Sequence, residues 1–427
     1  MAHDATPKFK QPVTGILAFF TFFFIALGTW FLFSDVRGPV KLFPYPFVLY
    51  LAVMILVGLW QHMLLGDWPF AKLKQPLKGV VLTMVNLMVT FFVIHVLFYR
   101  IFGLGFNFLS QANLNALAEA CKATLPGGGA LTLEAMQAKH FGESALVSFV
   151  LIGFFTYPVI TILFGKWPIR PSNLEQPQAG FAELGWTSLV TLFFFVALIV
   201  PFWGMVFSKA LGSSYGLNTP WWGSIGGTMH LHWVFGWWEW SIIALFMTAN
   251  VWRGKPWNLI RLPQPLKGLV AMTGVFAIGY AMAMLCVKLA PLWIGADTIA
   301  QLKAAKPHDA EYIRFLWYHA AEIAGFMLIP FLVWHHYFDD KTPFKDVDGW
   351  AAFTFRTVGV LLFGVLNYLF FYYANFGHWG LGNPHMTTVA HRLIGGESLV
   401  WNFWWIIPLL WNDWFFGKWG FYKAAKA

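Results

Sequence analysis

The sequence predicts an all-α, polytopic integral membrane protein, with about ten transmembrane helices arranged as five parallel two-helix hairpin repeats. Three observations predict this fold. Hydrophobic residues make up 58% of the chain and charged residues only 11%, against roughly 25% charged in an ordinary soluble domain. The apolar residues fall in runs of about 20, the length that crosses a hydrocarbon layer of about 30 Å. A short motif, Gln-Pro-x-x-Gly, opens alternate runs.

Each apolar run is interpreted as one spanning helix, in a single transmembrane domain that covers residues 1–427. The predicted helices lie at 13–33, 44–65, 79–101, 143–164, 182–207, 231–252, 268–290, 314–335, 350–374 and 396–416. The number of helices is even, so both termini are expected on the same side of the membrane.

The repeat is visible where the helices meet. Four copies of Gln-Pro-x-x-Gly stand at 11–15, 75–79, 176–180 and 264–268, and a degenerate fifth stands at 345–349. The even-numbered helices end in elbows rich in Gly, Trp, Lys and Pro, at 66–69, 165–168, 254–257 and 417–419. Proline ends one helix and fits the first turn of the next, while Trp and Lys suit the headgroup level. The predicted hairpins are 11–70, 75–170, 176–257, 264–343 and 345–420.

Orientation follows from the basic residues. The tails and elbows carry 17 of the 28 lysines and arginines, which places both termini in the cytoplasm, in a bacterial inner membrane. A net charge of +9 does not indicate nucleic acid, because the basic residues are scattered through short loops. The bilayer is the predicted partner, and partner subunits or a homo-oligomer stay open.

Histidines and carboxylates gather where the even-numbered helices begin, at the predicted outer face. An i, i+3 spacing puts His140 with Glu143, and His319 with Glu322, on one helical face each. Imidazole and carboxylate bind Cu, Fe or Zn, and facing imidazoles hold the iron of haem b. The candidate metal or haem ligands are His95, His140, His230, His232, His319, His385 and His391. The competing interpretation is structural, since interfacial histidine is amphipathic and such pairs also begin helices.

A second set of residues is suited to a proton or substrate path. Glu239 lies well inside the sixth helix, where a carboxylate costs a few kcal/mol unless it faces a cavity, a partner or a proton. Arg356 is a second intramembrane charge, although snorkelling to the headgroups explains it equally well. The candidate path residues are Glu239, Glu143, Glu322, Glu397 and Arg356.

The motifs that are missing narrow the function. The sequence has no GxxxxGK[ST], GxGxxG, HExxH or CxxCH, so an ATP-driven pump or a nucleotide-dependent enzyme is not expected. The favoured hypothesis is a transporter or permease for a small solute or ion, proton-coupled through Glu239 and the outer-face His/Glu pairs. The alternative is a membrane redox or metal protein, as a subunit of a larger electron-transfer complex. A third hypothesis is an assembly subunit without a substrate. No catalytic residue is assigned.

Overall fold

The computed structural model describes residues 6–40, 47–102, 141–170, 174–194, 231–305, 309–338, 349–382 and 397–423. Within these ranges the fold is all-α, with twelve α-helices. Five helical segments are long and apolar enough to cross a bilayer, which makes the chain an integral membrane protein. They are α1 (Val13–Phe33), α3 (Leu77–Phe91) with its extension η2 (Phe92–Phe102), α12 (Leu266–Ile294), α14 (Asp309–Tyr337) and α15 (Trp350–Tyr372).

Five further helices overlap the remaining predicted ranges, although residues 195–207 of the predicted helix 182–207 lie outside the described residues. They are α2 (Phe47–Leu59) with η1 (Trp60–Leu64), α7 (Phe141–Pro158) with η5 (Val159–Leu163), α8 (Gln178–Phe194), α11 (Leu231–Phe246) with η8 (Met247–Val251), and α18 (Glu397–Trp414). Two helices were not predicted, α13 (Ala296–Ala305) and α16 (Phe376–Trp379). Hydropathy therefore locates the helices well, because apolar runs of this length are stable in lipid only as helices.

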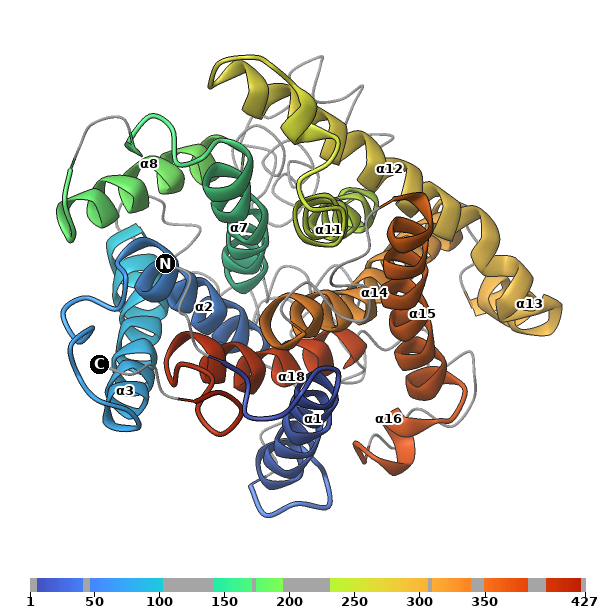
Figure 1. Cartoon of the computed structure of the whole chain (residues 1–427). Coiled ribbons are helices and arrows are strands. Elements are labelled where there is room, and N and C mark those ends of the chain that lie inside the picture. The colour runs from blue at the N-terminus through green and yellow to red at the C-terminus, as the bar shows by residue number, and fades with distance from the viewer. Residues whose placement is uncertain are drawn as a thin grey trace.

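The helices form an inner and an outer group. In Figure 1, α2, α7, α11, α14 and α18 surround the centre of the bundle, and α1, α3, α8, α12 and α15 lie outside them. In α14, 89% of the most apolar stretch is buried, compared with 22–28% in α1, α3, α12 and α15. The outer helices expose large apolar side chains such as Phe24, Met88 and Phe193. This apolar perimeter suits contact with lipid.

Every inner helix ends with the same backbone hydrogen bond, in which an N–H donates to the carbonyl five residues earlier. The donors are Leu65, Phe164, Trp252, Phe338 and Phe416, and we call them the closing residues. This step is one residue longer than in a regular α-helix. The inner helices therefore share a reference point from which positions along them can be compared.

The glutamines of the Gln-Pro corners cap these helix ends. Each glutamine donates a side-chain N–H to the backbone carbonyl of the residue just before a closing residue. This carbonyl is one of the last in its helix, and such carbonyls lack an N–H partner within the helix. The pairs are Gln11 with Tyr337 (2.6 Å), Gln75 with Phe415 (2.7 Å), Gln176 with Leu64 (3.0 Å) and Gln264 with Leu163 (2.8 Å). Each of these outer helices is thus tied to an inner helix that is distant in the sequence.

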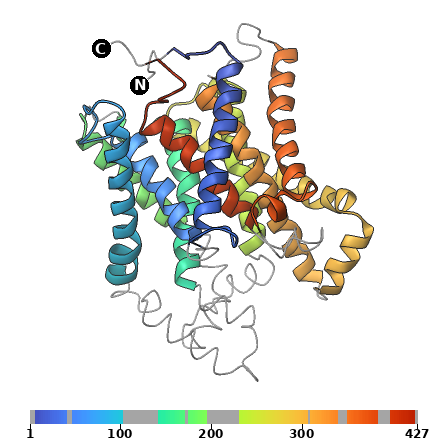
Figure 2. The ribbon, with the colours of Figure 1, turned by 90° about the horizontal axis from the view of Figure 1, so that it is seen from below.

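The two terminal segments pair with each other. Lys8 N–H donates to the Phe421 carbonyl (2.8 Å) and Lys423 N–H to the Thr6 carbonyl (2.9 Å). Both ends of the described chain therefore lie at the end of the bundle where the inner helices terminate (Figure 2). We call this the terminal end.

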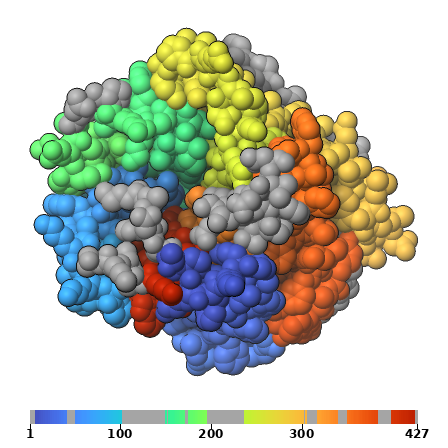
Figure 3. Space-filling view, in the orientation of Figure 1, coloured from blue at the N-terminus to red at the C-terminus, as the bar shows by residue number. Residues whose placement is uncertain are grey.

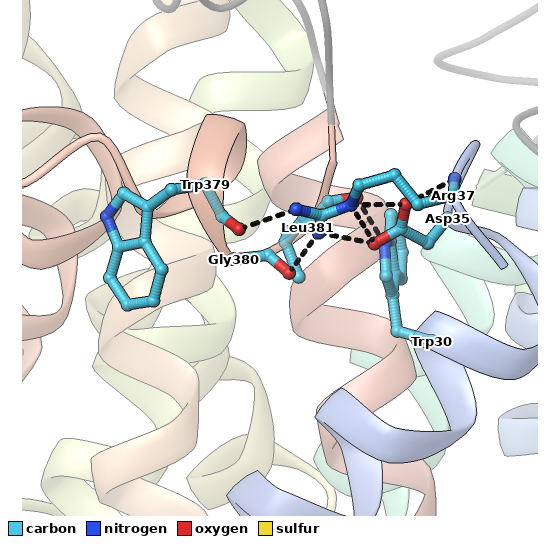
Figure 4. Close-up of polar contacts among 6 residues, drawn as sticks. All are labelled: Trp30, Asp35, Arg37, Trp379, Gly380 and Leu381. Atoms are coloured by element: carbon cyan, nitrogen blue, oxygen red, sulfur yellow. Dashed lines mark hydrogen bonds and ion pairs between the residues drawn. The ribbon is translucent and has the colours of Figure 1, made fainter.

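A clasp at the opposite end joins α1 to the segment after α16 (Figure 4). The Arg37 guanidinium pairs with the Asp35 carboxylate (2.6 Å) and donates to the Gly380 carbonyl (3.1 Å). The Trp30 indole N–H donates to the Leu381 carbonyl (3.0 Å). Burial opposes ionisation of Asp35, but the hydrogen bonds and charge of Arg37 outweigh it and hold the pKa of Asp35 below its ordinary value.

Candidate functional site

A cavity of about 740 Å³ lies among the five inner helices. Its volume is within the range of about 300–1,000 Å³ that is common for small-molecule sites. Tyr422 and Lys423 from the C-terminal segment line it, so its mouth is at the terminal end. In the space-filling view of this end, α1, α3, α8, α12 and α15 form the rim of the molecule (Figure 3). The cavity is lined mainly by the five inner helices, and at its mouth by the segment from Asp67 to Lys78 and by the C-terminal segment.

The cavity walls repeat from helix to helix. The residue six positions before the closing residue lines the cavity on all five inner helices: Leu59, Pro158, Phe246, Leu332 and Leu410. The residue ten positions before it does the same: Ile55, Phe154, Ile242, Leu328 and Ile406. Positions four apart share a helical face, so these are two successive apolar layers. We call them the Leu332 layer and the Ile242 layer.

Glu239 lies deeper, three residues beyond Ile242 toward the start of α11, and lines the cavity with Phe403. Its side chain is 5% exposed. It has no hydrogen bond or ion pair with any residue that the structure describes. The neighbouring Trp237 and Trp240 indoles are held in helix contacts, donating to the carbonyls of Phe276 (2.8 Å) and Ala320 (2.9 Å). Glu239 therefore faces a cavity, while its part in a proton path stays a prediction.

One group of charges at the mouth centres on Asp67. The Asp67 carboxylate contacts His62 Nδ1 (3.0 Å) and Lys78 Nζ (2.5 Å). Burial opposes ionisation of Asp67, but the hydrogen bonds and charges of His62 and Lys78 outweigh it and lower its pKa. This group joins the first elbow to the start of α3.

A second group at the mouth centres on Asp413. The Asp413 carboxylate contacts His336 Nδ1 (2.6 Å) and Lys418 Nζ (3.6 Å). Neither group was predicted from the sequence, because each joins residues of different elements. The elbows are the sequence feature that could have indicated these groups, because Asp67 and Lys418 each follow the glycine of an elbow.

The predicted His319–Glu322 pair forms a buried network away from the cavity walls. His319 Nδ1 contacts Glu322 Oε2 (2.9 Å), and His319 Nε2 contacts the Tyr368 hydroxyl (2.8 Å). Ser398 donates to Glu322 Oε1 (3.0 Å) and accepts from Tyr372 (3.0 Å). Both ring nitrogens of His319 and both carboxylate oxygens of Glu322 thus have protein partners. The network connects α14, α15 and α18.

The other candidates are scattered or lie outside the described residues. His95 contacts the Tyr50 hydroxyl, and Arg356 is buried in α15 with 5% exposure. His140, His230, His385 and His391, and the side chains of Glu143, His232 and Glu397, lie outside the described residues. In the part of the chain that the structure describes, no group of three His, Cys, Asp or Glu residues is placed to hold a metal ion.

The fold and the cavity define a helical integral membrane protein with a solute-sized central chamber. A scan against protein-family models finds no match, and searches of curated proteins and of solved structures find none either.

Proposed function

We propose that the chain is a proton-coupled permease for a small solute or ion, and that the central cavity is its translocation pathway. The observation that carries this proposal is Glu239, a buried carboxyl group at the inner end of a solute-sized cavity. An ionisable residue inside a membrane protein usually marks a substrate or proton path. The charged mouth, the two apolar layers and Glu239 succeed one another along this path.

The proposed architecture is the one predicted from the sequence, five parallel hairpins with both termini in the cytoplasm. The shared closing hydrogen bonds, the four glutamine caps and the matched cavity layers support it. In this arrangement the second helix of each hairpin belongs to the inner group and the first to the outer group. The excess of lysine and arginine in the elbows then puts the cavity mouth on the cytoplasmic side.

The proposed cycle uses bending of the inner helices. Proline stands inside three of them, at Pro158, Pro330 and Pro408. Proline removes a backbone hydrogen bond and lets a helix bend at that point. Bending there closes the apolar layers behind the solute and opens the far end, while Glu239 exchanges its proton or its ligand. The layers exclude water between turnovers.

Labelling from either side of the membrane tests the permease proposal without a known substrate. Cys121 and Cys286 are first replaced by serine, and Ile242→Cys then places a thiol in the cavity. In sealed vesicles, a membrane-impermeant thiol reagent is expected to label this thiol from the terminal side and also from the opposite side. Labelling from the terminal side alone overturns the proposal. Leu245→Cys is the matched control on the same helix, because Leu245 is fully buried away from the cavity and is expected to stay unlabelled.

The metal or redox hypothesis stays a prediction. Five of its seven histidines lie outside the described residues or have side chains that do. Metal analysis by mass spectrometry, with an absorption spectrum of the purified protein, tests it directly. Stoichiometric metal or a haem band that is lost on replacing His232 or His319 supports it, and protein with neither rejects it.

A further inference from the structure

We propose that the solute is a lipophilic organic monocation, with an apolar body and one delocalised positive charge, which exchanges for a proton on Glu239. The inference rests on the proposed permease function and names its substrate class. It is carried by the contrast between the walls of the cavity and the one carboxyl group at its inner end.

The walls favour an apolar body. Every residue of the Leu332 and Ile242 layers is hydrophobic, or is proline. A hydrated inorganic ion finds no oxygen or nitrogen ligands among these side chains, so its dehydration is not compensated. A solute that carries its own apolar surface gains from burial there. Phe154, Phe246 and Phe403 line the same space, and aromatic rings attract organic cations.

The positive charge of the proposed solute is inferred from Glu239. Among the described residues that line the cavity from the Leu332 layer inward, Glu239 alone is ionisable. On α14 and α12, which pack against α11, the described titratable side chains at similar depth are His319, Glu322, Tyr280 and Cys286. None of these four lines the cavity. The helix α7 also packs against α11, and none of its described side chains at that depth is titratable. An anion would meet a carboxylate without a compensating cation, whereas a monocation supplies the missing charge.

Exchange at a single carboxyl group balances charge and protons. When the cation pairs with the Glu239 carboxylate, the proton leaves to water at the mouth, and one positive charge has replaced another. At the mouth, two of the three described lysines that line the cavity, Lys78 and Lys418, each contact an aspartate, so most of the positive charge there is compensated. Because cation and proton compete for the same oxygens, binding of one requires release of the other.

Two probes of matched shape and opposite charge test the substrate class on the intact protein. Tetraphenylphosphonium and tetraphenylborate are titrated into detergent-solubilised protein by calorimetry, in two buffers of different protonation enthalpy, with empty micelles subtracted. We expect one phosphonium to bind with release of about one proton, and the borate to bind at least about tenfold more weakly. Equal binding of both probes, or phosphonium binding without proton release, overturns the proposal.

Substitutions at Glu239 and Ile242 test whether the phosphonium binds in the cavity. Glu239→Gln is expected to weaken phosphonium binding about tenfold or more and to abolish proton release. Glu183→Gln, at a carboxyl group paired with Lys166 outside the cavity, is the control and is expected to leave both unchanged. Ile242→Trp narrows the cavity next to Glu239 and is expected to weaken binding with Glu239 intact. Unchanged phosphonium affinity in both cavity variants overturns the proposal.

The two experiments distinguish a wrong substrate class from a wrong permease function. If the Ile242→Cys thiol is labelled from both sides and phosphonium does not bind, the pathway stands and the substrate class is wrong. If that thiol is labelled from the terminal side alone, the permease function is wrong whatever the titration gives.

Discussion

At the scale of single residues, carboxyl groups take different roles according to their partners. Asp35 and Asp67 pair with basic side chains at the ends of helices. Glu322 is enclosed by His319 and Ser398. Glu239 has no described partner and faces the cavity. A paired carboxylate stabilises structure, whereas an unpaired one in an apolar site is available to a ligand or a proton.

Asp35 gives a prediction about pH. Its pKa is lower in the folded protein than in an unfolded chain, so its ionised form stabilises the fold above the ordinary carboxyl value of about 4. This stabilisation is lost as the pH falls below that value toward the folded pKa. Asp35→Asn is expected to cost about 1–2 kcal/mol at pH 7 and little at pH 3, in thermal unfolding of the detergent-solubilised protein. An equal loss at both pH values would show that the charge of Asp35 is not responsible.

Ser398 gives a prediction about the buried network. Ser398→Ala removes the hydroxyl that connects Tyr372 to Glu322 and takes one hydrogen bond from each of these two buried groups. The expected loss of stability is about 1–3 kcal/mol, measured by thermal unfolding. Ser188→Ala removes a half-buried hydrogen bond to Tyr157 and is expected to cost less, because it takes a hydrogen bond from one polar group instead of two. A larger loss at Ser188 than at Ser398 would contradict this account.

At the scale of secondary-structure elements, glycine sets how closely inner and outer helices approach. A Cβ added at Gly279 of α12 would lie 2.6 Å from the backbone N and Cα of Ser241 in α11. Backbone atoms cannot move aside as a flexible side chain can, so the two helices would have to separate. Small residues allow such contacts in membrane bundles.

Substitution at Gly279 tests this contact. Gly279→Ala is expected to destabilise the protein by about 1–3 kcal/mol through overpacking. Gly28→Ala in α1 is the matched control, since no atom lies within 4 Å of its added Cβ, and it is expected to leave the melting temperature unchanged or slightly higher. Similar melting temperatures for the two variants would mean that the close approach is not needed for stability.

The helices were predictable from the sequence because lipid imposes a minimum apolar length. The predicted range 13–33 coincides with α1, and 268–290 lies inside α12 (Leu266–Ile294). The segment of α13 was expected to be a loop because Asp297 and Lys303 make it too polar to span. Four-residue α16 is too short for any periodic signal.

The grouping of the helices, and most of the cavity, was not predictable. Lipid and a protein interior are equally apolar, so nothing in the pattern distinguishes Ile242, which lines the cavity, from Leu245, which packs away from it. Glu239 was found because charge is rare inside an apolar run. Asp67 and Lys78 stand in different elements, and their pairing depends on tertiary structure alone.

At the scale of the whole molecule, the five inner helices surround one cavity, and its two apolar layers lie between the mouth and Glu239. In the proposed permease these layers exclude water, as hydrophobic constrictions do in channels. At the same end, the paired terminal segments join the first and last parts of the described chain.

The Leu332 layer gives a prediction about leakage. Leu332→Asn puts a hydrogen-bonding amide into the layer, and the proton leak of proteoliposomes, followed with an internal pH dye, is expected to rise several-fold. Leu332→Met conserves apolar character and approximate volume and is expected to behave as the wild type. Equal leakage from the two variants would show that this layer is not a barrier.

The glutamine caps also set an order of assembly during synthesis. The partners of Gln176 and Gln264, at Leu64 and Leu163, have already been translated when these glutamines leave the ribosome. Gln11 and Gln75 emerge early and must wait for Tyr337 and Phe415, near the end of the chain. The N-terminal helices are therefore expected to enter the bilayer before these two partners exist. The segment after α18, the last described helix, supplies the partner of Gln75.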